Sequence, residues 1–327
     1  MPLHKCYNLC MSCTSPLYAW KTGHYTENGK DVLFVTRHKG APSLIEVNKR
    51  FSGEFQLKAG DPFVKHGRLC VKMEIPCGHC EGCRLDHSRM WSQRCMLESL
   101  SYDCNWFITL TYDDLHIRDA KKDDFSAFMK RLRFEFGPGI RFYAVGELGE
   151  RSGRYHVHAI LFNLPLTDAE LVNVNDGTYT SQTIYKLWPY GQHLLGSVTP
   201  ESCAYVARYC MKKTGEDSLC WINMSRRPGI GASFLEEHLD EIYRTWKVYA
   251  RFDKNHLTAL PPRYFKKLLD KYGIDYTEKK LAAVRMSKVS ILNDAKVHHD
   301  DSPDSYLARK RGENKNKKLR LQRRRTI

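Results

Sequence analysis

Two histidines separated by one residue, His156 and His158, are the clearest candidates for chemistry in this chain. They lie within residues 143–162, which read as two strands joined by a polar turn that contains glycine. Side chains alternate across a strand, so both imidazoles project from one face, and Glu147 on the partner strand joins them if it pairs opposite either histidine. Two imidazoles and a carboxylate form a divalent-metal site. A pair of ordinary surface or core histidines is the alternative interpretation.

Two tyrosines further along the chain could supply a nucleophile. Tyr205 and Tyr209 fall within residues 201–213, where Thr199 as a cap and Pro200 at the first position predict a helix. A spacing of four residues places both phenols on one face of that helix, one turn apart. A tyrosine pair at this spacing is also common in simple packing, which is the alternative.

Lysines follow the tyrosine pair. Lys212 and Lys213 fall on or beside the same helical face one turn further on. Tyrosine is a poor nucleophile at its ordinary pKa, so attack needs help. A metal that neutralises a target phosphate, together with a lysine cation near the phenol, would make attack feasible. The histidine pair and the tyrosine pair therefore support each other as parts of one site.

A cysteine cluster predicts a second metal site. Cys77, Cys80 and Cys83 are spaced as Cys-x2-Cys-x2-Cys, and Gly78 and Gly82 permit the tight turn that directs the sulfurs at one ion. Zinc takes four ligands, and the fourth could come from the N-terminal cysteines Cys6, Cys10 and Cys13. Free thiols or a redox pair are the alternative.

Composition narrows the class of protein. The chain has 327 residues, and Lys plus Arg exceeds Asp plus Glu by 52 − 37 = 15, which favours a polyanionic partner, nucleic acid first. No apolar run is long enough to span a bilayer and no signal segment is visible, so we expect no membrane partner. Twelve cysteines without an export signal suggest reduced thiols or metal ligands.

The order of expected elements predicts an α+β fold. A strand at 105–112, a helix at 124–136, the hairpin, a helical start near Leu166, a strand at 193–198 and the tyrosine helix give an antiparallel sheet with helices packed on one face. Four parts are expected along the chain: a cysteine-rich zinc-binding region at 1–103, a catalytic domain at 104–250, a helical extension at 251–308 and a basic disordered tail at 309–327.

Several ordered motifs carry a resemblance to a known family. They are Cys13 to Trp20, Pro76 to Leu85, Phe107 to Asp113, Tyr205 to Cys210 and Arg227 to Gly231. Together they resemble the replication initiation proteins of gokushoviruses, small single-stranded DNA microviruses, within the HUH endonuclease superfamily. One departure is Tyr155, where many relatives of the superfamily have proline before the first histidine.

The resemblance implies a mechanism. It implies an HUH, ferredoxin-like (RRM-like) sheet in which His156, His158 and Glu147 hold Mg²⁺ or Mn²⁺. One of Tyr205 and Tyr209 would attack origin DNA, forming a 5′-phosphotyrosyl link and freeing a 3′-hydroxyl, and the other would later release a circle. Which tyrosine acts first stays open. Further roles implied by the resemblance are phenolate stabilisation by Lys212, with Lys213 as fallback, and zinc binding by Cys13, Cys77, Cys80 and Cys83.

The expected partners follow from the charge and from the resemblance. Arg208, Lys213, Arg226 and Arg227 are the predicted DNA-binding residues, although the glycine-rich segment 225–233 is equally consistent with an ordinary turn. The basic tail should add salt-sensitive DNA affinity. A host helicase and polymerase are expected partners, and the host bacterial cytoplasm the location. Two alternatives stand: a plasmid initiator, relaxase or transposase with the same chemistry, and a zinc-containing nucleic-acid-binding protein without catalysis.

Overall fold

The computed structural model describes residues 13–27, 31–149, 153–209, 220–252 and 255–279, together with single positions between 282 and 312. The chain forms two compact units, one made of residues 1–86 with 292–327 and the other of residues 87–291. The predicted division into four parts stays a prediction.

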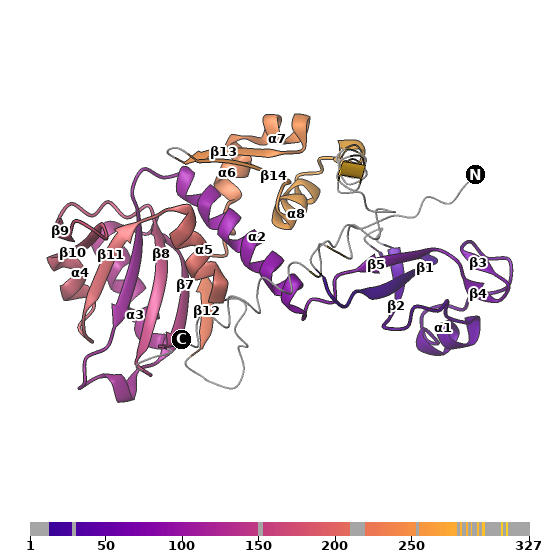
Figure 1. Ribbon diagram of the computed structural model, residues 1–327, viewed down its shortest axis with the longest axis horizontal. Helices are drawn as coiled ribbons and strands as arrows, with labels where there is room; N and C mark the ends of the chain where they lie inside the picture. Colours follow the sequence, from indigo (N-terminus) through magenta and orange to yellow (C-terminus); the bar gives the residue numbers. More distant parts are fainter. Residues whose placement is uncertain are drawn as a thin grey trace. The chain divides into compact units, whose positions relative to one another are not determined.

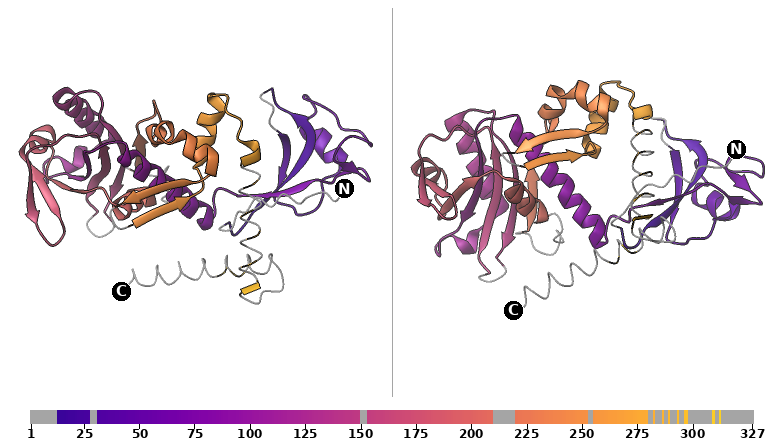
Figure 2. Two further views of the ribbon diagram at one scale, coloured as in Figure 1. Left: turned by 90° about the horizontal axis from the view of Figure 1, so that it is seen from above. Right: turned by 45° about the horizontal axis from the view of Figure 1, so that its top comes forward.

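The first unit is built on a small antiparallel sheet, coloured indigo in Figure 2. Its strands follow the order β2 (Asp31–Thr36), β1 (Leu17–Tyr25), β5 (Lys72–Ile75). Helix α1 (Leu44–Arg50) and the two-stranded ribbon β3 (Val64–Lys65) with β4 (Arg68–Leu69) also belong to this unit. Its core is formed by Trp20, Val47, Leu57 and Leu69.

The second unit is organised around a seven-stranded sheet in which all neighbours are antiparallel (Figure 1). Its strand order is β12 (Trp221–Met224), β7 (Arg141–Leu148), β8 (Tyr155–Phe162), β6 (Asn105–Thr111), β11 (His193–Ser197), β10 (Thr178–Ser181), β9 (Ala169–Asn173). The predicted α+β class with a large antiparallel sheet is confirmed. The predicted helical start near Leu166 is wrong, because residues 169–173 form edge strand β9.

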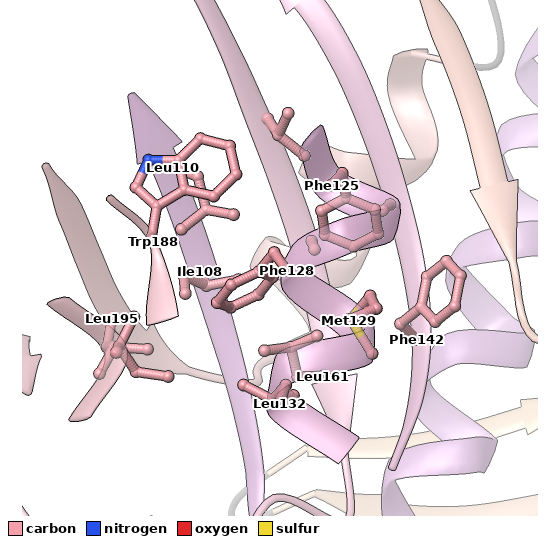
Figure 3. Close-up of a cluster of buried hydrophobic side chains, with 14 of the residues drawn as sticks. Ile108, Leu110, Phe125, Phe128, Met129, Leu132, Phe142, Leu161, Trp188 and Leu195 are labelled. Carbon is pink, nitrogen blue, oxygen red and sulfur yellow. The ribbon is translucent and has the colours of Figure 1, made fainter. Parts of the chain in front are cut away.

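Helix α3 (Lys122–Phe136) covers one face of this sheet together with α4 (Gln182–Leu187). The aromatic residues Phe125 and Phe128 recur at helical spacing and pack on the strands, as Figure 3 shows. Their partners include Ile108, Leu110 and Leu161, together with Trp188 from the segment after α4. This face is the main hydrophobic core of the unit.

Helices also cover the opposite face, so the prediction that the helices pack on one face is wrong. Helix α2 (Glu81–Leu100) and helix α5 (Pro200–Arg208) bury Cys95 and Val206 against Tyr143, Val145 and Ile160. The physical reason lies in β7 and β8, whose side chains are apolar at successive positions. A strand that is apolar on both faces requires cover on both faces.

Further described elements of the second unit pack around the C-terminal part of α2. Helices α6 (Ala232–Glu237), α7 (Leu239–Thr245) and α8 (Arg263–Lys271) share a core with Leu97, and β13 (Val248–Phe252) pairs with β14 (Asn255–Ala259). A 3₁₀ turn, Ile117–Asp119, follows β6. Among the described residues, no helix combines the length and apolar character needed to cross a membrane.

Candidate functional site

The register of the β7–β8 hairpin brings the predicted ligands to one face. Glu147 lies directly opposite His156, and Val145 lies opposite His158. Because side chains alternate along β8, both imidazoles and the Glu147 carboxylate project from the same side of the sheet, while Val157 joins the core on the other side. The sequence left open whether Glu147 pairs opposite His156 or His158, and the structure shows that it pairs opposite His156.

The three side chains are close enough to bind one ion. Oε1 of Glu147 lies 3.1 Å from Nε2 of His156 and 3.5 Å from Nε2 of His158. Neighbouring ligands of an octahedral ion with bonds of about 2.1 Å are about 3.0 Å apart, so this spacing fits. Glu147 and His158 are buried, with 4% and 6% exposure.

The second nitrogen of each imidazole is held by another group. Nδ1 of His158 lies 2.9 Å from the Thr109 hydroxyl, and Nδ1 of His156 lies 3.1 Å from the backbone carbonyl oxygen of Arg154. Both rings therefore turn Nε2 toward Glu147. Metal-binding histidines are normally oriented by such a bond at the nitrogen that does not bind the ion.

This donor set fits a divalent cation. One carboxylate oxygen and two imidazole nitrogens converge on a single point, and their ligand atoms all lie within 4.8 Å of one another. Three protein ligands on one side leave further positions for water or a phosphate oxygen. The hairpin can thus hold a cation and present it to a substrate.

The tyrosine helix α5 lies over the same face of the sheet. It begins as predicted, with the Thr199 hydroxyl accepting a hydrogen bond from the backbone N–H of Ser202 and with proline at the first position. Its apolar residues Cys203 and Val206 pack on the sheet. This docking directs the Tyr205 hydroxyl toward His158.

Both phenols reach the histidine cluster. The Tyr205 hydroxyl lies 3.3 Å from Nε2 of His158, and the two ring centroids are 5.0 Å apart. The Tyr209 ring stacks near His158 at 5.9 Å and meets the Tyr205 ring edge-on at 5.4 Å. The two elements that the sequence singled out separately therefore form one site.

The two phenols differ in their surroundings. Tyr205 is 36% exposed, whereas Tyr209 is half-buried. Burial raises the pKa of Tyr209 far above its ordinary value, and hydrogen bonding to Glu147 and to Tyr205 adds to the shift. Tyr205 is thus the phenol more open to a ligand.

Strand β6 contributes two residues to which the sequence assigned no role. Thr109 pairs directly opposite His158 and bonds its ring. Phe107, two residues earlier on the same face, lies 5.8 Å from the His158 ring in a stacked arrangement and meets Tyr205 edge-on at 6.1 Å. The alternation along β6 was the available signal, but it needed the pairing of β6 with β8 to be interpreted.

A buried aromatic pair supports the hairpin from the other face. The indole Nε1 of Trp221 donates a hydrogen bond of 2.6 Å to the Tyr155 hydroxyl. These two groups lie beside Gly146, where an added Cβ would overlap both of them. Gly146 and Tyr155 flank Glu147 and His156 respectively, so this packing fixes the backbone that carries two of the ligands.

The predicted DNA-binding residues do not all reach the cluster. Arg208 is exposed on α5 next to Tyr209, whereas Arg226 and Arg227 are exposed in the loop after β12. Met224 at the end of β12 pairs with Tyr143, four residues from Glu147, a separation of about 13 Å along the strand. Lys212 and Lys213 lie outside the described residues, and their predicted roles stay predictions.

The loop that carries the two exposed arginines is firmly anchored. Buried Glu98 accepts hydrogen bonds from Arg141 and from the backbone N–H of Gly231. The Tyr264 hydroxyl accepts a bond of 2.8 Å from the backbone N–H of Gly229. Residues 225–231 therefore form an ordered turn with basic side chains on its outer side, which is compatible with either of the two interpretations made from sequence.

The cysteine cluster assembles in the first unit. Sγ of Cys80 lies 3.6 Å from Sγ of Cys13 and 3.5 Å from Sγ of Cys83, and Cys77 lies 3.9 Å from Cys83. Among the described residues Cys13 is therefore the fourth member, while Cys6 and Cys10 lie outside them. Burial opposes ionisation of Cys80, but hydrogen bonds from the backbone of Cys83 and Thr14 hold its pKa at about 6.

The family model and the relatives that match this chain are all described as replication-associated proteins. A family model described as replication-associated protein ORF2/G2P matches residues 105–214. The chain is 30% identical to the replication-associated protein ORF2 of Spiroplasma virus 4, over 83% of this chain and 85% of that protein. It is 32% identical to the replication-associated protein VP4 of Bdellovibrio phage phiMH2K, over 66% and 72%.

A third relative is the replication-associated protein ORF4 of Chlamydia phage 1, with 30% identity over 60% of this chain and 54% of that protein. No solved structure matches the chain.

Proposed function

The chain belongs to the family of replication-associated proteins of gokushovirus-type microviruses, and we propose that it initiates replication by cutting and rejoining single-stranded viral DNA. This proposal assigns to it the HUH type of endonuclease and strand-transfer chemistry. Its substrate is the origin of the viral genome.

One observation carries the proposal: the Tyr205 hydroxyl lies 3.3 Å from Nε2 of His158, a member of the three-ligand cluster. A nucleophile and a cation site that lie together on one face of the sheet can act on the same phosphodiester. Packing alone gives no reason for two imidazoles, a carboxylate and two phenols to converge on one face of a sheet.

In the proposed reaction the Tyr205 oxygen attacks the scissile phosphorus. The new phosphoester joins Tyr205 to the 5′ phosphate of the downstream DNA fragment. The bond from phosphorus to the 3′ oxygen breaks, and this oxygen takes up one proton as the phenol loses one. Glu147, His156 and His158 would hold Mg²⁺ or Mn²⁺, which would supply Lewis-acid polarisation of the phosphate. Thr109 and the Arg154 carbonyl hold the two rings in place.

The second phenol can carry out a second cleavage, which ends a round of replication. Tyr209 lies on the same helical face, with its ring 5.4 Å from that of Tyr205. After one round of synthesis its oxygen can attack the regenerated origin, so that the 3′ hydroxyl released there displaces Tyr205 and closes a circle. Each step exchanges one phosphodiester for another, so the bond energy is kept and no outside activation is required. Lys212 is proposed to stabilise the phenolate, with Lys213 as the fallback.

DNA contacts and partners follow from the same proposal. Arg208 adjoins the tyrosines, and Lys213, Arg226 and Arg227 are proposed to bind the phosphate backbone. The freed 3′ hydroxyl requires a polymerase, and strand separation requires a helicase, both proposed to come from the host. The relatives belong to viruses of bacteria, so the proposed location is the cytoplasm of a bacterial host.

Cleavage of viral DNA tests this function. Circular single-stranded DNA of the virus that encodes the chain is incubated with the purified protein and Mn²⁺, and its conversion to a linear form is followed on a denaturing gel. We expect linear product with the wild-type protein and none with Glu147→Gln, which keeps the size of the side chain but removes its charge. A protein that binds this DNA without ever cutting it is a binding protein, and the proposal is then wrong.

A further inference from the structure

The cysteine cluster of the first unit is separate from the proposed catalytic residues. We infer that Cys13, Cys77, Cys80 and Cys83 form a structural zinc site. This inference does not rest on the proposed function, because its argument uses only the geometry of the four thiols and of the backbone around them.

The distances between the sulfur atoms match a tetrahedral zinc ion. With Zn–S bonds of about 2.3 Å, two thiolates of a tetrahedral site lie about 3.8 Å apart. The observed separations are 3.9 Å for Cys77 and Cys83, 3.6 Å for Cys80 and Cys13, and 3.5 Å for Cys80 and Cys83. Disulfide-bonded sulfurs lie about 2.05 Å apart, so these are not disulfides. In a four-iron cluster each cysteine binds a different iron, which spreads the sulfurs further apart.

Backbone N–H groups converge on the sulfurs. The N–H of Cys80 donates to Sγ of Cys77 at 3.2 Å, that of Thr14 to Sγ of Cys80 at 3.4 Å, and that of Cys77 to Sγ of Cys13 at 3.5 Å. Such donors offset the negative charge that four thiolates bring to one ion. Gly78 adopts a φ of +78° between two of the ligands, which lets the chain form the tight turn.

The topology explains how residues distant in sequence meet. Leu17 of β1 pairs with Ile75 of β5, so the segment before β1 and the segment after β5 leave the sheet at the same end. Cys13 and Cys77 lie in those two segments, and Cys83 lies in the first turn of α2. A bound ion thus joins one end of the small sheet to the start of α2, which is the role of a closed structural site rather than of a catalytic one.

Elemental analysis of the full-length protein tests the site. Protein purified without added zinc and dialysed against a weak chelator is expected to retain about one zinc ion per chain. Cys80→Ser should lower this content by more than about tenfold. The matched control is Cys70→Ser, because Cys70 lies in the same unit outside the cluster and its loss should leave the zinc content unchanged.

Two further measurements distinguish this zinc site from the hairpin site and allow for a cysteine variant that does not fold. His156→Ala combined with His158→Ala should leave the zinc content intact, which separates this site from the hairpin site. If Cys80→Ser does not fold, cobalt substitution of the wild-type protein should give the thiolate-to-metal charge-transfer absorption of a four-cysteine centre. The inference is overturned by metal-free protein without that absorption, by iron in place of zinc, or by zinc that is lost with the two histidines and kept in Cys80→Ser.

Discussion

The hydroxyl of Tyr205 lies 3.3 Å from Nε2 of His158, although the two residues belong to different elements that are 47 positions apart. Helix α5 and strand β8 each need the other for this contact, because the helix buries Cys203 and Val206 on the strand face that carries the histidine. The proposed chemistry depends on this docking.

The two tyrosines should not be equivalent in the first cut. Tyr205 is the more exposed phenol, whereas Tyr209 is half-buried and hydrogen-bonded to Glu147. We expect Tyr205→Phe to slow the first cleavage of a linear single-stranded origin oligonucleotide by about tenfold more than Tyr209→Phe does, equivalent to about 1.4 kcal/mol in the barrier. Single-turnover cleavage of end-labelled DNA measures both rates. A larger loss in Tyr209→Phe would reverse this order.

Thr109 should support metal binding by orienting the His158 ring rather than by contacting the substrate. Its hydroxyl lies 2.9 Å from Nδ1 of that ring, so Thr109→Val removes the bond while keeping the shape of the side chain. We expect the affinity for Mn²⁺ to fall about 10- to 100-fold, as measured by titration calorimetry.

The matched control is Thr111→Val on the same strand face. The Thr111 hydroxyl bonds the Gln192 carbonyl oxygen instead of a histidine, so this variant should keep its Mn²⁺ affinity. Equal affinities in the two variants would refute the positioning role of Thr109.

Tyr155 should contribute to stability. Tyr155→Phe leaves Nε1 of Trp221 without its acceptor in a buried position, which is expected to cost about 1–3 kcal/mol of unfolding free energy. Urea denaturation measures this cost. Tyr185→Phe, at an exposed position on α4, is the control and should change stability by less than about 0.5 kcal/mol. An unchanged midpoint for Tyr155→Phe would show that the hydrogen bond contributes nothing.

Arg226 and Arg227 should act through charge. Replacing both with alanine is expected to weaken binding of single-stranded DNA uniformly across sequences and to reduce the salt dependence of log K by about 1 to 2 units of slope. Fluorescence anisotropy at several salt concentrations measures both quantities. Lys130→Ala with Lys186→Ala removes the same charge from exposed positions on α3 and α4 and should have a smaller effect. If the arginine and lysine variants weaken DNA binding equally, Arg226 and Arg227 belong to an ordinary turn with no special role in binding DNA.

Local patterns predicted much of the fold and the site. Alternating side chains identified β7 and β8, helical spacing identified α3, and the Thr199 cap with proline identified the start of α5. These features depend on neighbours in sequence. The choice of Cys13 as the fourth cysteine, by contrast, depends on the pairing of β1 with β5, which spacing alone did not determine.

The features that sequence did not predict are set by tertiary packing. Helices cover both faces of the sheet because β7 and β8 carry apolar side chains on both faces. Edge strand β9 forms because β10 is available to pair with it. Phe107 gains its place beside His158 only once β6 lies next to β8. In each case the partner is distant in the chain, so a local pattern carried no information about it.

The most direct test of the account is the covalent link itself. The protein is incubated with single-stranded viral origin DNA and Mn²⁺, the adduct is isolated on a denaturing gel, and its peptide is mapped by mass spectrometry. We predict a nucleotide attached through its 5′ phosphate to Tyr205 or Tyr209, and no adduct when both are phenylalanine. An adduct that persists in the double variant, or cleavage of the DNA with no adduct at any stage, would contradict tyrosine attack.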